Sequence, residues 1–233
     1  KSFAKRRIRA PFPFARIEQD AVHLPFVVIT PHGIARNVYL VSAVDVCTGY
    51  PVGWHLVIGA PREMDSLSCL EMYLTPAKAS RFKELGLTNA INIYGAPSVL
   101  VFDNGPETKG GRILGLKVLE VDVMHCKAMA AQGKPFIERL HKALKEALQR
   151  QPGCTRFEGQ DGVRDPVALG DKLMTLDELE KWIVRWFYES WVHTELERLR
   201  WDELLVDSVK GKTPFERLKY MTEEMGHPIT MPP

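Results

Sequence analysis

The sequence lacks the features that mark several large classes of protein. Only 4 of its 233 residues are cysteine, and none form a Cys-x-x-Cys pair, so reduced cytosolic thiols are favoured over disulfides or a zinc site. Apolar runs such as residues 26–29 are far shorter than the ~18 residues that span a bilayer. The basic N-terminus is not followed by the apolar segment of a secretory signal. These absences predict a globular protein that has no contact with a membrane.

The net charge is also small, because 31 Lys and Arg residues are nearly balanced by 29 Asp and Glu residues. The resulting charge of +2 is too small to indicate any particular kind of partner. Its distribution is more informative, since five cations and no acid occupy the first nine residues and leave 26 cations against 29 acids elsewhere. We therefore predict a basic arm over residues 1–11. It is either a solvated tail or a segment that follows a phosphate backbone. The chain begins with Lys1, so we expect the arm to be the end of a linker from a preceding region.

Hydrophobic patterning predicts strands first and helices later. The expected strands are 15–22 continuing into 26–29, 37–46, 52–58, 98–102 and 116–123. The expected helices are 63–74, a second one to about 85, 134–150, one from the capping box at 175–178 and one from the capping box at 213–216. This order predicts an α/β protein with a mixed five-stranded sheet flanked by helices.

We divide the chain into the arm, a core over 12–150, a Gly- and Pro-rich surface loop over 151–170, and a helical extension over 171–233. Four of the five tryptophans fall in the extension. Aromatic residues at helical spacing can form a stacking surface for nucleic acid, but they more often belong to a core. We favour the core.

Three acidic residues lie at positions where an ionised side chain lowers stability unless it has a functional role. Asp20 lies at the head of the first apolar strand, Asp103 directly follows five apolar residues, and Glu138 lies in the first turn of the long helix. Each has an ordinary explanation: Asp20 can cap a turn, Asp103 can start an Asx-turn, and Glu138 favours a helix N-terminus. The joint pattern, with 35 residues between the second and third acids, favours a functional role.

Two segments around these acids resemble the conserved motifs of a known protein family. Asp103-Asn104-Gly105-Pro106-Glu107 and the segment from Gln132 to Arg139 resemble the hallmark segments of retroviral-integrase-type DDE transposases, whose last two acids are typically 35 residues apart. The long 83-residue spacing from Asp20 to Asp103 is most similar to TnsB/TniA-type bacterial transposases. The resemblance covers roughly residues 12–220 and extends to residues 43–45, Gly53, 151–155 and 211–217. Departures are Thr108, where many relatives have an aromatic residue, and the inserted Pro135-Phe136.

The resemblance implies a ribonuclease H-like (integrase catalytic core) fold and a metal-dependent DNA strand transferase in the bacterial cytoplasm. Asp20, Asp103 and Glu138 would be its catalytic residues and hold two Mg²⁺ ions, for which Mn²⁺ can substitute. We expect Asp20 to bridge both ions, and Asp103 and Glu138 each to complete the coordination shell of one ion. Asp45 and Asp122 are expected to be structural. Water would cut the transposon end, and the resulting 3′-OH would attack target DNA. The implied partners are transposon-end DNA, target DNA, further copies of the chain on DNA, and an AAA+ ATPase that chooses the target.

A row of cations flanks the third acid. Lys134, Arg139, Lys142 and Lys145 lie along the expected exposed side of the long helix, so we predict contacts to the DNA backbone. Without the acids, a solvated basic face would be the simpler interpretation. Two rival functions stay open: a metal-dependent nuclease on the same fold, and a non-catalytic DNA-binding or assembly module.

Overall fold

The computed structural model describes residues 8, 10–103, 105, 108–126, 133–158, 162–205 and 210–226. The cations of the predicted basic arm (Lys1, Lys5, Arg6, Arg7 and Arg9) lie outside the described residues. So do four residues of the two hallmark segments: Asn104, Pro106, Glu107 and Gln132.

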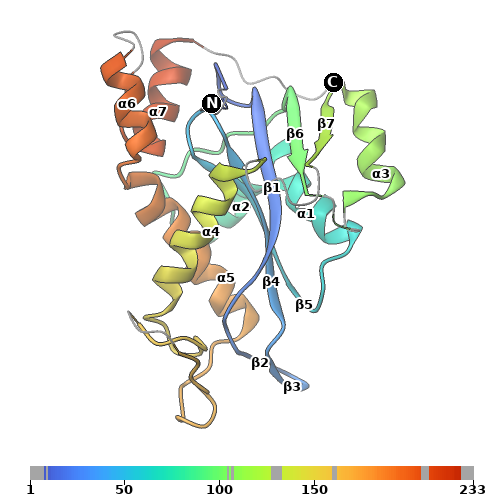
Figure 1. The fold of residues 1–233 in the computed structure, drawn as a ribbon, viewed down its shortest axis with the longest axis vertical. Helices are drawn as coiled ribbons and strands as arrows, with labels where there is room; N and C mark the ends of the chain where they lie inside the picture. Colours follow the sequence, from blue (N-terminus) through green and yellow to red (C-terminus); the bar gives the residue numbers. More distant parts are fainter. Residues whose placement is uncertain are drawn as a thin grey trace, which may run out of the picture.

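A mixed five-stranded sheet forms the centre of the molecule, as the sequence predicts (Figure 1). Its strands are β1 (Arg16–His23), β4 (Val38–Asp45), β5 (Pro51–Ile58), β6 (Val99–Phe102) and β7 (Asp122–His125). They lie in the order β5-β4-β1-β6-β7, with β4 antiparallel to both β5 and β1, and β6 parallel to both β1 and β7. A small hairpin of β2 (Val28–Thr30) and β3 (Gly33–Ala35) extends from the end of β1. This arrangement is consistent with a ribonuclease H-like core.

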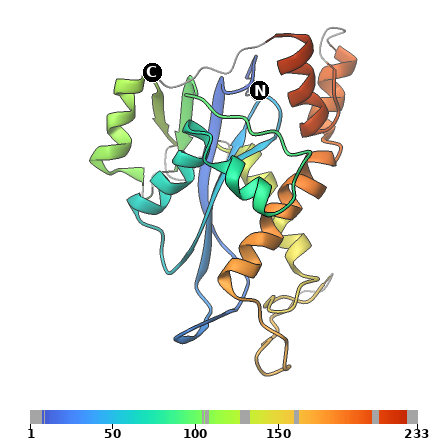
Figure 2. The same cartoon turned by 180° about the vertical axis from the view of Figure 1, so that it is seen from behind.

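Consecutive side chains of β1 contact helices on opposite faces of the sheet. Gln19 contacts α1 (Glu63–Leu74), since its Nε2 donates to the Ser66 carbonyl and its Oε1 accepts from the Tyr73 hydroxyl. Glu18 contacts α4 (Pro135–Leu148) on the other face. Figures 1 and 2 show the two helices on opposite sides of the sheet. Because both faces are covered, every residue of β4 is buried except the half-buried Tyr39.

The fifth strand differs from the prediction, because only the last two residues of 116–123 belong to a strand, which then continues to His125. Residues 116–119 belong to a 3₁₀ helix, Gly115–Leu119, that continues the short helix α3 (Gly111–Leu114). The buried side chains Ile113 and Leu116 are three residues apart, which is a helical spacing, whereas Val118 is 85% exposed. Glu120 then adopts a left-handed conformation (φ 57°), after which the chain enters β7 at Asp122.

The remaining helices comprise three in the predicted order and one, over residues 197–205, that the sequence pattern did not predict. They are α2 (Lys78–Glu84), α5 (Leu176–Arg185), α6 (Glu197–Leu205) and α7 (Pro214–Lys219), with π-helical turns at Trp186–Ser190 and Tyr220–Glu224 and a 3₁₀ turn at Trp191–His193. Both predicted capping boxes are confirmed: Thr175 caps α5 with Glu178, and Thr213 caps α7 with Glu216. Among the described residues, no helix is both long and apolar enough to cross a membrane.

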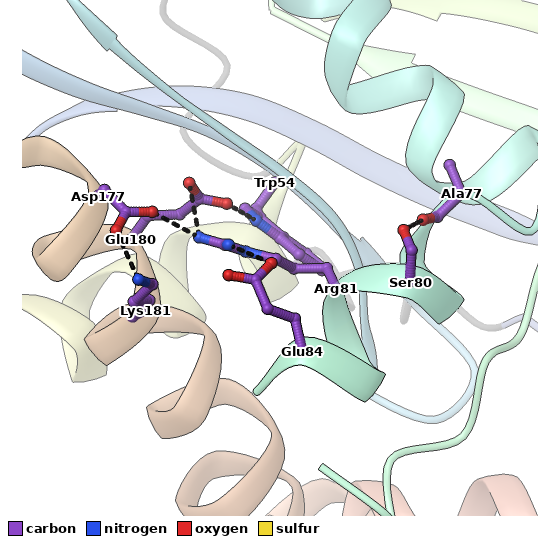
Figure 3. Close-up of polar contacts among 8 residues, drawn as sticks. All are labelled: Trp54, Ala77, Ser80, Arg81, Glu84, Asp177, Glu180 and Lys181. Carbon is purple, nitrogen blue, oxygen red and sulfur yellow. Dashed lines mark hydrogen bonds and ion pairs between the residues drawn. The ribbon is translucent and has the colours of Figure 1, made fainter. Parts of the chain in front are cut away.

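Polar contacts fix the C-terminal helices to the β5 edge of the sheet (Figure 3). The Trp54 indole on β5 donates to Glu180 of α5 at 3.0 Å, and Arg81 of α2 pairs with Asp177 and Glu180. The tryptophans of this region are mainly packing residues, as expected: Trp191 is 4% exposed, although Trp201 is 51% exposed. The helical extension therefore packs against the sheet along this edge.

Gly53 provides a test of how closely α1 packs on the sheet. A Cβ added there would lie 2.6 Å from the Cys69 carbonyl oxygen and 2.9 Å from the Tyr73 ring. We expect Gly53→Ala to lower the free energy of unfolding by about 1–3 kcal/mol, because backbone has to shift to relieve the overlap. Gly111→Ala in α3 is the control, since a Cβ there meets nothing within 4 Å. Urea denaturation that gives both variants wild-type stability would contradict the close packing of α1.

Candidate functional site

The parallel pairing of β1 and β6 brings the first two predicted acids together. Glu18 on β1 lies beside Val101 on β6, and extending this register by two residues places Asp103 alongside Asp20. Both side chains line one small cleft at the end of β6. The Thr108 hydroxyl closes the loop after Asp103 by donating to the Asp103 carbonyl at 2.7 Å. The carboxyl ends of parallel strands are common ligand sites in open α/β sheets.

The third acid reaches the same region because α4 is anchored on β1. The buried Glu18 carboxylate accepts from the backbone N–H groups of Phe136 (2.9 Å) and Ile137 (3.0 Å), two of the N–H groups at the start of a helix that have no partner within it. Glu18 and Asp20 are two residues apart in a strand and so lie on the same face. The anchor therefore sets the first turn of α4, which carries Glu138, next to the strand that carries Asp20.

Arg16 completes the anchor from the same strand. One of its guanidinium nitrogens, Nη2, donates to the Gly133 carbonyl at 2.8 Å and lies 3.5 Å from the second oxygen of Glu18. Burial raises the pKa of Glu18, while the two N–H groups and Arg16 act to lower it. Both ends of the turn that begins α4 are thus tied to β1.

Lys134 lies among the three acids and not on an exposed helix face. Its ammonium is 2.8 Å from Asp20 Oδ1 and 3.9 Å from Asp103 Oδ2, and its side chain is 6% exposed. The expectation that all four cations share the exposed side of the helix is therefore wrong for Lys134. The reason is its position just before Pro135, where the chain enters the helix above Asp20. Arg139 and Lys142 are exposed as expected, and Lys145 is half-buried.

The electrostatics also indicate that the three acids are neighbours. Burial raises the pKa of Asp20, opposed by Lys134 and supported by the charge of Asp103. Burial likewise raises the pKa of Glu138, where Lys134 acts in the opposite direction and both aspartates add to the increase. The charge of Asp103 thus reaches Asp20, and the charges of both aspartates reach Glu138, as expected of acids that lie near one another.

The side chains offer the donors that a hard divalent cation prefers, since all three are carboxylates. The Lys134 ammonium shows that this spot already attracts a positive charge. In the described part of the chain, however, no three His, Cys, Asp or Glu side chains stand close enough together to hold one ion. The residues fit Mg²⁺ by their chemistry, and holding it would require that Lys134 move off Asp20 and that the three carboxylates come closer together.

An open groove of about 590 Å³ leads away from the acids along α4. Its lining includes the acids Asp20, Glu138 and Glu146 and the cations Lys142, Lys145 and Arg156, together with Ala21, Val22, His23, Pro25, His141 and Gln149. Among the described residues, no acid forms an ion pair with Lys142, Lys145 or Arg156. Burial lowers the pKa of Lys145, and the positive charge of nearby Arg156 lowers it further. By contrast, Arg150 pairs with Glu158, and Arg164 pairs with Asp171. The groove therefore offers cations for a bound polyanion.

The two acids that we expect to be structural, Asp45 and Asp122, line neither the groove along α4 nor the cleft at the end of β6. The buried Asp45 carboxylate accepts from the Phe14 N–H and from both the N–H and the hydroxyl of Thr48, which organises the turn after β4. Asp122 is exposed at the start of β7. The His193 ring packs against Phe215 with ring centres 5.0 Å apart.

The sequence interpretation missed Glu18 and Arg156. Glu18 carried a usable signal, because it is an acid two residues before Asp20 in an apolar strand and hence on the same face. Nothing in the sequence pattern singles out Arg156, since only the folded loop brings it to Lys145.

Comparisons with known proteins give one match that covers most of the core. The family described as the TnsB C-terminal domain matches residues 18–153, more than half of the chain. No curated protein matches the chain. A similar solved structure is a simian T-cell lymphotropic virus intasome in complex with the PP2A regulatory subunit B56 gamma, with 14% identity and a TM-score of 0.49. That match covers 84% of this chain and 55% of the intasome chain, so the chain spans little more than half of its length.

The Glu18 anchor can be tested by removing its carboxylate. We expect Glu18→Ala to lower the free energy of unfolding by about 1–3 kcal/mol, because two N–H groups at the start of α4 lose a buried acceptor. Amide hydrogen exchange at Phe136 and Ile137 should accelerate. The control is Glu71→Ala on the exposed surface of α1, expected within about 0.5 kcal/mol of wild type. Unchanged exchange at both amides would show that Glu18 does not hold α4.

Proposed function

This chain belongs to the TnsB C-terminal domain family, a transposase family, and we propose that it is the catalytic domain of a DDE-type DNA transposase. In this proposal it cuts transposon ends and joins their 3′-OH groups to target DNA. Asp20, Asp103 and Glu138 are its catalytic residues. The observation that carries the proposal is the convergence of Asp20 and Asp103, by strand register, with a helix whose first turn presents Glu138.

The chemistry requires two successive attacks on phosphorus. In the first, a water oxygen forms a bond to the phosphorus at the transposon end, and the 3′-oxygen leaves as the 3′-OH. In the second, that 3′-OH attacks a target phosphodiester and releases its 3′-oxygen, so the number of phosphodiester bonds is conserved. Neither step forms a covalent enzyme intermediate or consumes ATP.

Asp20, Asp103 and Glu138 would hold two Mg²⁺ ions, or Mn²⁺ in their place. When bound, such ions activate the attacking oxygen and stabilise the charge on the leaving oxygen. The chain itself contributes orientation: the sheet register fixes the two aspartates, and the Glu18 anchor fixes the helix of the third acid. In the metal-free protein, the Lys134 ammonium forms an ion pair with the Asp20 carboxylate.

In this proposal, DNA would lie along the groove beside α4. From Glu138 to Gln149 the helix rises roughly 16 Å at ~1.5 Å per residue, which equals about five base-pair steps of duplex. Lys142, Lys145 and Arg156 would contact phosphates along this path, and exposed Arg139 would contact DNA beside it. Transposon-end DNA, target DNA, further copies of the chain and an AAA+ ATPase are the partners that this function requires.

The catalytic assignment is tested by strand transfer. A pre-cut transposon-end duplex, target plasmid and Mn²⁺ are mixed with wild-type protein, and covalent joining is measured. We expect Asp103→Asn and Glu138→Gln to reduce joining by at least about 100-fold, since metal-held charge stabilisation is worth several kcal/mol. The control Asp122→Asn removes an exposed acid of β7 and should join normally.

The same assay separates the rival functions. Nicked plasmid without joined ends would identify a nuclease, and neither product would identify a binding or assembly module. Near-normal joining by Asp103→Asn would remove this residue from the site.

The groove cations are tested by the salt dependence of DNA binding. We expect Lys142→Ala and Lys145→Ala to weaken binding to all sequences alike, and each to reduce the slope of log K against log[salt] by about one unit. Lys83→Ala on α2 is the control, because this exposed lysine lies outside the groove. Slopes equal to wild type in both groove variants would show that the α4 cations are merely solvated.

A further inference from the structure

A polar pair lies buried between α4 and the sheet. Ser42 Oγ and His141 Nε2 share a hydrogen bond of 2.8 Å, and the two residues are 0% and 6% exposed. The other buried residues of α4 are all apolar: Ile137, Leu140, Leu144 and Leu148. A leucine at position 141 would be buried without the cost of removing an imidazole from water. Burial alone therefore gives no reason for a histidine here.

The two partners stand next to two of the proposed catalytic acids. Ser42 is the direct cross-strand neighbour of Asp20 in the pairing of β1 with β4. His141 follows Glu138 by three residues, so the two lie on neighbouring turns of the same side of α4. The hydrogen bond thus connects the strand residue beside the first acid to the helical turn beside the third.

The histidine acts without charge. Burial, followed by the nearby Lys145 and Lys134, lowers the pKa of His141 to about 3. The ring is therefore neutral near pH 7, and its contribution is the direction and length of one hydrogen bond. It adds no cation beside the carboxylates.

We infer that Ser42 and His141 are positioning residues that fix the first two turns of α4, and with them Glu138, relative to Asp20. Arg16 and Glu18 attach the main chain of residues 133–137, all on the N-terminal side of Glu138, to β1. The Ser42–His141 bond adds a side-chain attachment about one turn beyond Glu138, within the apolar stripe that packs on the sheet. Glu138 therefore lies between two polar attachments to the sheet.

The catalytic consequence of this inference rests on the proposed function, whereas the structural tie does not. The test therefore has two readouts on the full chain. Ser42→Ala and His141→Leu break the bond, and His141→Gln keeps it, because a glutamine amide can take the place of Nε2. Leu148→Ala, at the far end of the same buried stripe, is the matched control for general loss of stability.

The first readout is amide hydrogen exchange in metal-free protein. The amides of residues 136–141 should exchange about tenfold faster in Ser42→Ala and His141→Leu, which corresponds to about 1.4 kcal/mol of local opening. His141→Gln should exchange like wild type. In Leu148→Ala the acceleration should be concentrated at residues 142–148. Wild-type exchange over 136–141 in both bond-breaking variants would overturn the inference, whether or not the protein joins DNA.

The second readout is the joining reaction at saturating DNA. We expect kcat to fall about 10- to 100-fold in the two bond-breaking variants, with KM for DNA within about threefold of wild type, because misplacement of a catalytic group acts mainly on the chemical step. His141→Gln should restore most of kcat. An equal loss in Leu148→Ala at the same decrease in Tm would overturn the inference. A wild-type protein that fails to join would refute the proposed function and leave the exchange data to decide the structural tie.

Discussion

The carboxylate of Glu18 is the interaction on which the candidate site depends. It is buried in the strand that carries Asp20, and it accepts the first free N–H groups of α4. A buried carboxylate is costly unless hydrogen bonds and a countercharge compensate for the lost water, and here the helix N-terminus and Arg16 supply both. The consequence is geometric: the helix that bears Glu138 begins beside Asp20, although 118 residues separate the two in the chain.

The sequence predicted most of the fold for identifiable physical reasons, whereas the catalytic role of Asp20, Asp103 and Glu138 stays a prediction. The helix 63–74, the strand before Asp103 and the two capping boxes were predictable because each rests on local periodicity or a local hydrogen bond. The strand predicted at 116–123 was wrong over residues 116–121, because a short apolar segment fits both a strand and a helical turn. Glu18 as an anchor, Lys134 as a partner of Asp20, and Arg156 in the groove depend on contacts between distant segments, which no single-segment pattern contains.

The Lys134 ammonium places a positive charge beside the carboxylates of the candidate site. Burial raises the pKa of Asp20 and of Glu138, the nearby acids raise both further, and the Lys134 ammonium lowers both, so it stabilises the ionised carboxylates of the metal-free protein. The same ammonium competes with any cation for Asp20. Strand register and helix anchoring bring the three acids to one region of the fold. In the proposed function, a metal ion would replace the Lys134 ammonium at Asp20 as the three carboxylates draw together.

The most direct test of this account is anomalous scattering from Mn²⁺ in crystals of the protein bound to a pre-cut transposon-end duplex. The account predicts Mn²⁺ peaks bonded to the carboxylates of Asp20, Asp103 and Glu138, with the Lys134 ammonium moved away from Asp20. Crystals in which Lys134 stays paired with Asp20, and Mn²⁺ binds elsewhere or not at all, would contradict the claim that these three acids form one metal site.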